Sequence, residues 1–226
     1  MRTVLFAGPT LARARIIDAE LPLDGVEIRT PIKRGDLTTL MAEQVPGRIV
    51  LVDGLFHTEI AVGHLEIRTA LSKGWEVWGL SSMGAIRARE MSSLGMKGYG
   101  RVYELYCQEG VDFRDDEVTL MHGNHPDYRE LSEPLVHIRE ALTDLVTQAV
   151  LTDIQRATLV SELEEMWYAE RTLAWLLQRL RDIVPAYETS GFLAGFDRYR
   201  IKSLDLIRFL RDGQGSDREP TVQIGQ

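Results

Sequence analysis

Hydrophobic residues in the first half of the chain gather in short, nearly continuous runs, with longer amphipathic stretches between them. The runs are typical of strands buried on both faces of a sheet, and they cover residues 3–7, 26–30, 48–52 and 75–78. The amphipathic stretches have helical periodicity and cover residues 11–20, 36–44, 58–73 and 83–94. Four alternations of strand and helix predict an α/β fold with a parallel, doubly wound sheet of the Rossmann or flavodoxin type.

The second half of the chain is helical in pattern. Amphipathic stretches at 135–151, 153–181 and 201–211 predict helices, and the polar segment 213–226 predicts a disordered tail. We therefore expect an α/β core domain over residues 1–150, a C-terminal helical extension over 151–212 and a tail over 213–226. In such a core, ligands bind at the edge formed by the carboxyl ends of the strands.

Composition narrows the range of partners and compartments. The 226 residues include 34 Asp and Glu against 26 Lys and Arg, a net charge of -8, and 44% of them are hydrophobic. An acidic surface repels a phosphate backbone, so we expect no nucleic-acid partner. A single cysteine excludes an internal disulfide, and no apolar run reaches the ~18 residues that a spanning helix needs. We expect no membrane association and a cytoplasmic location.

The turn at residues 79–85 carries the sharpest chemical signal. A strand ends there, small residues follow and a helix begins, so Ser82 lies beside the unpaired amides and positive dipole end of a helix. One interpretation makes Ser82 a nucleophile, with the amides of Met83 and Gly84 holding an oxyanion and Gly84 allowing close approach of a substrate. The other makes Ser82 an ordinary N-cap, a position at which serine is common.

Charged residues on neighbouring elements can likewise be interpreted either as functional or as structural. Arg87 lies about one turn beyond Ser82, where it can bind a carboxylate or pair with Glu90 on the helix surface. Asp53 ends the preceding strand and either points into the crevice above the sheet or serves the turn. His64 shares a stripe with apolar residues, as a core histidine does, but if it faces the crevice it is the best general base for Ser82.

Metal and cofactor sites find less support in the sequence. The acidic run 115–117 with His122 can be interpreted as hard-metal ligands, or as a solvated charge run beside a short strand at 118–121. The glycines at 95–100 follow a helix instead of opening one, unlike a dinucleotide-binding loop. We therefore expect neither a metal nor a cofactor.

In their order and spacing, these pieces resemble the core of the TfuA-like family. The resemblance covers about residues 4–145, and its matching segments are 6–11, 34–37, 49–56, 62–67, 79–90, 95–100, 115–118, 122 and 132–139. The helical region from about residue 150 onward contains no matching motif.

The resemblance implies a role in peptide backbone thioamidation, a modification of ribosomally synthesised peptides. TfuA-like proteins accompany a YcaO enzyme, which uses ATP to activate a peptide amide, and are thought to release sulfide from a thiocarboxylated, ubiquitin-like sulfur carrier protein. We therefore expect a YcaO-type enzyme and such a carrier as partners. The expected activity is that of a hydrolase acting on the C-terminal thiocarboxylate of the carrier.

On this resemblance, the candidate site residues take definite roles. The catalytic candidates are Ser82, His64, Asp53 and Glu90, and the substrate-binding candidates are Arg87, Met83, Gly84, Ser81, Glu66 and His122. Ser82 attacks the thioacyl carbon. His64, oriented by Asp53 or Glu66, then assists hydrolysis of the acyl-enzyme. In a variant without a covalent intermediate, Glu90 or His64 activates water directly and Ser82 only binds.

Three other functions fit the same sequence. A non-catalytic adaptor would recruit the carrier or the peptide to the YcaO enzyme through the tryptophan-bearing helices. A small-molecule hydrolase would use the same serine turn, and a metal enzyme would use the run 115–117 with His122. The general base stays open among His64, His122 and Glu90.

Overall fold

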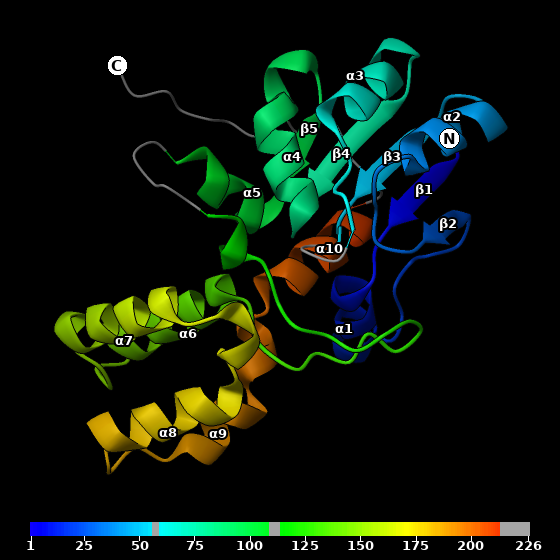
Figure 1. Cartoon of the computed structure of the whole chain (residues 1–226). Helices are drawn as coiled ribbons and strands as arrows, with labels where there is room; N and C mark the ends of the chain where they lie inside the picture. Colours follow the sequence, from blue (N-terminus) through cyan, green and yellow to red (C-terminus); the bar gives the residue numbers. More distant parts are fainter. Residues whose placement is uncertain (56–58, 109–113, 213–226) are drawn as a thin grey trace.

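The described part of the chain has two regions, a layered α/β region and a group of helices beside it (Figure 1). It comprises residues 1–55, 59–108 and 114–212 of this computed structural model. The tail expected at 213–226 lies outside the described residues, so its disorder stays a prediction.

The described residues form a five-stranded, wholly parallel sheet in the order β2-β1-β3-β4-β5. The strands are β1 (Thr3–Phe6), β2 (Val26–Arg29), β3 (Arg48–Leu51), β4 (Glu76–Leu80) and β5 (Lys97–Tyr99). The four strands expected from the hydrophobic runs are confirmed, and so is their parallel direction. The pattern does not predict β5, because this three-residue strand contains no hydrophobic run.

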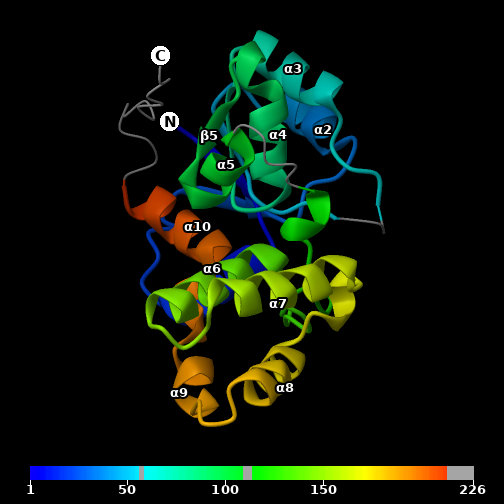
Figure 2. The same cartoon turned by 90° about the vertical axis from the view of Figure 1, so that its left-hand side faces the viewer.

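Helices cover both faces of the sheet, which confirms the doubly wound α/β fold (Figure 2). Alternate residues of β1 point to opposite faces: Val4 and Phe6 pack with α2, α3 and α4, whereas Leu5 packs with α1 and α10. The helices of this region are α1 (Pro9–Ile17), α2 (Asp36–Glu43), α3 (His64–Ser72), α4 (Met83–Met91), α5 (Gly100–Cys107) and α10 (Ile201–Arg211). The start of α5 at Gly100 corrects one expectation, because the last of the glycines at 95–100 opens a helix.

A second group of helices has its own apolar core. It consists of α6 (Leu135–Thr147), α7 (Asp153–Glu165), α8 (Leu173–Ile183) and α9 (Thr189–Ala194). The prediction of a single helix over 153–181 is wrong, because the helix is interrupted between α7 and α8. Thr172 marks the new start: its hydroxyl accepts the N–H of Trp175 and caps α8.

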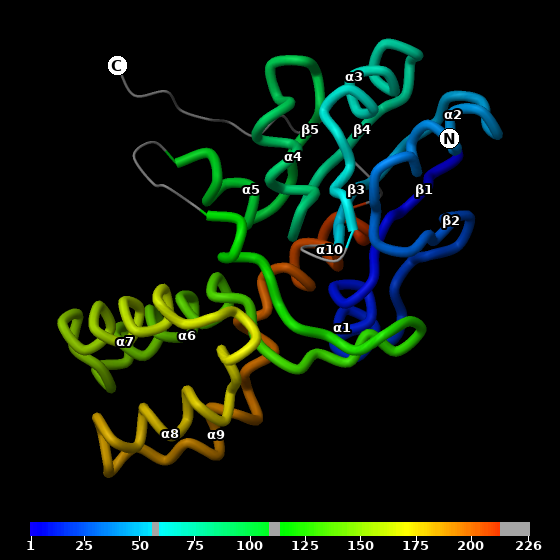
Figure 3. The backbone as a smooth tube through the Cα atoms, in the orientation of Figure 1, coloured from blue at the N-terminus to red at the C-terminus, as the bar shows by residue number. Residues whose placement is uncertain are grey.

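The last helix, α10, returns from this group to the sheet (Figure 3). Phe209 contacts Trp78 of β4 edge-to-face, with ring centroids 5.5 Å apart, and Leu206 packs in the same apolar cluster. The expected extension over 151–212 therefore contains a helix that covers the α/β core. This return brings the first turn of α10 to the carboxyl end of β4, where Ser81 bonds it.

Candidate functional site

A cavity of about 340 Å³ lies at the carboxyl edge of the sheet. It is next to the point where the strand order reverses between β1 and β3, which is where open α/β sheets bind ligands. Residues that follow strands line one side, and residues from later in the chain line the other. The lining includes Pro9, Asp53, Ser82, Val118, His122 and Lys202.

Ser82 lies in this cavity at the N-terminus of α4, where the sequence predicts it. Its backbone is neither helical nor extended, with φ -132° and ψ -129°, and its side chain makes no capping hydrogen bond to the helix. N-capping therefore does not account for this serine. A hydroxyl that lines a cavity without capping its helix is a candidate nucleophile.

Ser81, the residue before it, turns away from the cavity. Its side chain is 0% exposed, and its hydroxyl donates a hydrogen bond to the carbonyl oxygen of Lys202 at 2.7 Å. The substrate contact expected of Ser81 therefore has no accessible surface in this arrangement.

Close packing of α4 on the sheet decides which amides of the turn are available. The N–H of Gly84 donates to the carbonyl of Val52 at 3.1 Å, so it is not free to hold an oxyanion as expected. A Cβ at Gly84 would lie 1.8 Å from the carbonyl oxygen of Leu51, so this glycine lets the helix, not a substrate, approach. No described residue accepts a hydrogen bond from the amide of Met83, an orphan donor at the start of the helix.

Asp53 lines the cavity but is engaged by the start of α1. One carboxylate oxygen accepts the N–H groups of Gly8 and Thr10 at 2.8 and 3.0 Å, and the other accepts the Thr10 hydroxyl at 2.6 Å. These bonds attach the helix that follows β1 to the end of β3. The structure therefore does not bring Asp53 to His64, which it was expected to orient.

Lys202 reaches the cavity from α10, and the sequence analysis misses it. The residue is buried, and its ammonium donates a hydrogen bond to the carbonyl oxygen of Val118 at 2.8 Å. Burial lowers the pKa of Lys202, against the opposing effect of Asp53 and two buried glutamates. A lowered pKa increases the fraction of neutral amine, which is the form that can accept a proton.

The sequence contains a signal that could have found this lysine. Lys202 and Asp205 fall on the same helical stripe as Leu206 and Phe209, and all four are buried. Charged residues are almost never fully buried without a specific partner, so a charge on an apolar stripe indicates a built site.

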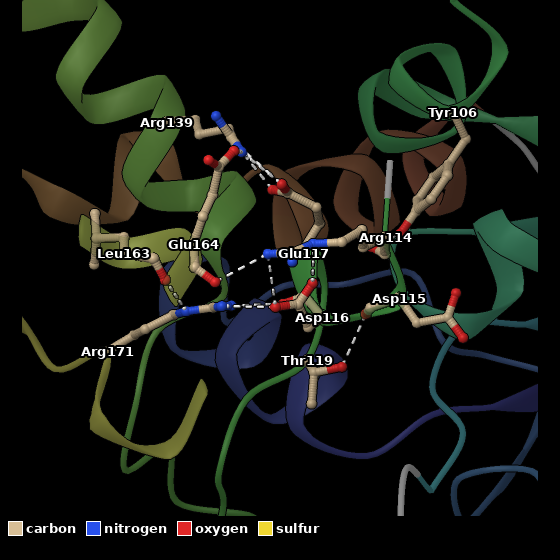
Figure 4. A network of polar contacts seen from close by, with 10 residues as sticks. All are labelled: Tyr106, Arg114, Asp115, Asp116, Glu117, Thr119, Arg139, Leu163, Glu164 and Arg171. Atoms are coloured by element: carbon tan, nitrogen blue, oxygen red, sulfur yellow. Dashed lines mark hydrogen bonds and ion pairs between the residues drawn. The ribbon is translucent and has the colours of Figure 1, made fainter. Parts of the chain in front are cut away.

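The residues just before the cavity wall at 118–121, Asp116 and Glu117, form ion pairs with the helical group (Figure 4). Arg171, with a side chain 0% exposed, donates to the carboxylate and the carbonyl of Asp116 at 2.7 and 2.9 Å, and to the carbonyl of Leu163 at 2.9 Å. Arg139 pairs with the buried Glu117 at 2.7 Å. Within the run 115–117, Asp115 is exposed as a solvated charge would be, whereas Asp116 and Glu117 are engaged by these arginines.

The short strand expected at 118–121 is wrong. These residues form no strand, and the adjacent pairing is an isolated bridge between His122 and Glu130. The segment is instead an irregular wall whose backbone can turn polar groups inward, as Val118 does toward Lys202.

His122 lies in the same cavity as Ser82. Its Nδ1 is 2.7 Å from the carbonyl oxygen of Gly123, and because a carbonyl only accepts, Nδ1 carries the proton. In the neutral ring this leaves Nε2 as an acceptor. Of the three candidate bases, His122 is the one that the lining of the cavity includes.

The other two candidate bases form a separate cluster on α3 and α4. His64 and Arg87 both contact the same carboxylate oxygen of Glu90, at 2.8 and 2.6 Å, and the His64 side chain is 57% exposed. Burial works to raise the pKa of Glu90, but the hydrogen bonds from His64 and Arg87 lower it on balance. Arg87 lines a neighbouring hollow of about 190 Å³ and also donates to the carbonyl of Val62. The structure does not bring this cluster to Ser82.

Glu66 supports the start of α3. Its carboxylate accepts the N–H groups of Gly63 and Gly35 at 3.4 and 2.9 Å. It thereby caps α3 and attaches the turn before α2, and these contacts do not orient His64.

Two searches for other sites cover the ranges 1–55, 59–108 and 114–212. There, no three His, Cys, Asp or Glu side chains are grouped so that they could hold a metal ion. None of the helices in these ranges combines the length and the apolar character needed to cross a membrane.

Comparison with known proteins places the chain in a family. A comparison with curated proteins finds no match. The family model described as TfuA-like protein matches residues 53–172, a range that holds the proposed nucleophile turn, the wall of the cavity and its ion pairs. The chain therefore belongs to the TfuA-like family, which associates it with a YcaO enzyme and the thioamidation system.

Proposed function

We propose that this protein hydrolyses the C-terminal thiocarboxylate of a ubiquitin-like sulfur carrier protein and so supplies sulfide to a YcaO enzyme. The observation that carries the proposal is the presence of Ser82 and Lys202 in one cavity at the carboxyl edge of the sheet. A hydroxyl and an amine of lowered pKa in one cavity form the combination that Ser–Lys hydrolases use.

The cavity suits the end of a flexible, glycine-containing tail. Its volume of about 340 Å³ has room for a few small residues. Arg87, which was expected to draw in the thiocarboxylate anion, lies in the neighbouring hollow. We assign this attraction instead to the start of α4, where the Met83 amide has no described acceptor and the helix dipole is positive.

Two balanced steps complete the reaction. In the first, the neutral amine of Lys202 takes the proton of the Ser82 hydroxyl, and the serine oxygen attacks the thioacyl carbon. The amide of Met83 stabilises the oxyanion, the C–S bond breaks, and the sulfur leaves with this proton as hydrosulfide. In the second, Nε2 of His122 takes a proton from a water molecule, whose oxygen attacks the carbonyl carbon of the ester on Ser82. The bond from this carbon to the serine oxygen breaks, the serine oxygen takes the proton back from His122, and the carrier leaves as a carboxylate with its remaining proton released to solvent.

Sulfide release by the purified protein tests this proposal. The wild-type protein is incubated with a carrier ending in a Gly-Gly thiocarboxylate, without YcaO enzyme or ATP. We expect one sulfide per carrier and conversion of the carrier to its carboxylate form, as measured by mass spectrometry. Ser82→Ala lowers kcat/KM by about 10³-fold or more, because it removes the nucleophile.

A serine at the other end of α4, directly after its last residue, provides the matched control. The hydroxyl of Ser92 donates to the carbonyl of Arg89 on the exposed end of the helix, so Ser92→Ala leaves the rate within about 3-fold. Absence of sulfide with wild-type protein and thiocarboxylated carrier contradicts the hydrolase.

The non-catalytic adaptor is the second candidate function. Trp167, with 58% of its surface exposed, lies next to Tyr168, which lines the cavity. An exposed tryptophan beside a cavity is a common binding anchor. If the protein is an adaptor, Trp167→Ala weakens carrier binding and the wild-type protein releases no sulfide.

A further inference from the structure

A buried hydrogen bond joins the two elements that carry the proposed nucleophile and base. Ser81 directly precedes Ser82, and its hydroxyl donates to the carbonyl oxygen of Lys202 at 2.7 Å. The bond connects the turn between β4 and α4 to the first turn of α10, across 121 positions of the chain. It therefore holds Ser82 and Lys202 in a fixed relation.

The backbone conformation at Ser81 favours glycine, so the presence of a serine there points to a role for its hydroxyl. Its φ of 66° lies in the left-handed region, which glycine adopts without strain and residues with a Cβ adopt rarely. A buried, non-glycine residue in this conformation persists where the surrounding structure requires it. Here the hydroxyl bond to Lys202 is the contact that glycine would lose.

The backbone N–H and the side-chain amine of Lys202 have hydrogen-bond partners on other elements. Its backbone N–H lies 3.4 Å from Nε2 of His137, and its Nζ donates to the carbonyl of Val118 at 2.8 Å. These two partners come from α6 and from the cavity wall. The bond from Ser81 comes from the turn of the nucleophile itself, so it is the contact that fixes one reacting group relative to the other.

We infer that Ser81 is a positioning residue that sets the spacing between the Ser82 hydroxyl and the Lys202 amine. This inference rests on the proposed function, in which Lys202 takes the proton of Ser82. Loss of the hydroxyl lets the first turn of α10 move relative to the serine turn. Small displacements of that kind slow proton transfer far more than they weaken substrate binding.

A neighbouring serine supplies the matched control for a test. Ser203 is also buried on the first turn of α10, and its hydroxyl donates to a backbone carbonyl, that of Thr10 on α1, at 3.2 Å. We expect Ser81→Ala to lower kcat for sulfide release by about 30-fold and to change KM by less than about 3-fold. Ser203→Ala should lower the melting temperature by a similar amount and keep kcat within about 3-fold.

Two further measurements separate positioning from simple support of the fold. Ser81→Gly removes the hydroxyl but adopts the positive φ without strain, so it should fold and show the same loss of kcat. Burial lowers the pKa of Lys202 against the opposing charges of Asp53, Glu130 and Glu133. A looser α10 admits water to the amine, so the acidic limb of kcat/KM moves to higher pH in both Ser81 variants.

The possible results separate the positioning role of Ser81 from the proposed function. If wild-type protein releases sulfide and the Ser81 variants match Ser203→Ala in kcat and pH profile, the positioning role is overturned and the proposed function stands. A rise in KM with unchanged kcat also overturns it. If wild-type protein releases no sulfide, the proposed function fails and the inference fails with it.

Discussion

The cluster of His64, Arg87 and Glu90 and the pair of Ser82 and Lys202 each involve α4 or the residue that begins it, yet they lie in different environments. The cluster lies on the outer side of α3 and α4, where water reaches His64. The pair lies in a cavity that α4 and the returning α10 line together. Helical periodicity relates side chains on one helix to each other, but it does not show which of them meets a helix from elsewhere in the chain.

The two regions also contain histidine–carboxylate pairs that differ in burial. His64 and Glu90 are 2.8 Å apart at the surface, whereas His137 and Glu133 are 3.2 Å apart and both buried beneath α10. Buried polar groups have larger effects when disturbed, because water cannot replace a lost partner. The cavity region should therefore respond strongly to substitution and the surface cluster weakly.

The largest expected contrast is between two lysines. Lys202→Met keeps most of the buried stem but removes the amine, so kcat/KM for sulfide release should fall by about 10³-fold. Lys97, which pairs with Glu76 on the surface, is the control, and Lys97→Met should stay within about 3-fold. Steady-state sulfide release measures both. Equal rates for the two variants would mean that the cavity lysine takes no part in the reaction.

Two arginines test whether the cavity wall depends on its ion pairs. Arg171→Met leaves Asp116 and two carbonyls without their buried partner, so the free energy of unfolding should fall by about 3 kcal/mol. Arg87→Met breaks a partly exposed pair and should cost about 1 kcal/mol or less. Urea denaturation of both variants checks the difference. A loss of stability as small as that of Arg87→Met would show that the contacts of Arg171 do not hold the cavity wall in place.

The two histidine pairs predict different effects of pH on stability. Burial lowers the pKa of His137 from 6.5 to about 4 despite its bond to Glu133, so between these values the unfolded chain binds a proton that the folded chain does not. Stability therefore falls as pH drops from 6.5 to 4, by on the order of 2 kcal/mol. His137→Asn should remove this fall, and His64→Asn, at the exposed pair, should keep it.

Burial raises the pKa of two carboxyl groups, Asp205 and Glu130, and these groups oppose this trend and have to be separated from it. Burial raises the pKa of Asp205 from 3.8 to about 6, against two amide hydrogen bonds, so its contribution to stability falls as pH rises through that range. Denaturation of Asp205→Asn at several pH values should give a steeper acid loss than wild type. The same slope in wild type and His137→Asn would show that His137 is not the source.

The smallest expected effect concerns the surface cluster itself. Glu90→Gln keeps hydrogen-bond acceptors for His64 and Arg87, so sulfide release should change by less than about 3-fold. A loss comparable to that of Lys202→Met would return the catalytic role to the cluster and reverse the comparison. Sulfide release at matched protein concentrations decides between these results.

Local patterns predict much of the fold and one residue of the proposed pair. Continuous apolar runs such as 48–52 predict strands buried on both faces, and small residues before a helix predict the position of Ser82. The break at Thr172 goes unpredicted because no proline or glycine interrupts the helical pattern there. β5 goes unpredicted because three residues are too few to show a period.

The rest of the site depends on contacts between distant segments. The spacing along α4 suggests that Arg87 lies near Ser82, but Met83 and Ile86 line the hollow in which Arg87 lies. Lys202 belongs to a helix whose pattern predicts its start and end but not its place on the sheet. The sequence also does not predict which amides of the turn are free to bind an oxyanion. The hydrogen bond from the Gly84 amide to the Val52 carbonyl depends on how closely α4 packs on the sheet.

Detection of the covalent intermediate tests the central claim most directly. Wild-type protein is mixed with thiocarboxylated carrier, quenched in acid, digested and examined by mass spectrometry for the carrier C-terminus on a protein side chain. The account predicts an ester on Ser82 that accumulates at early times and is absent from Lys202→Met. An ester on another residue, or full sulfide release by Ser82→Ala, would contradict it.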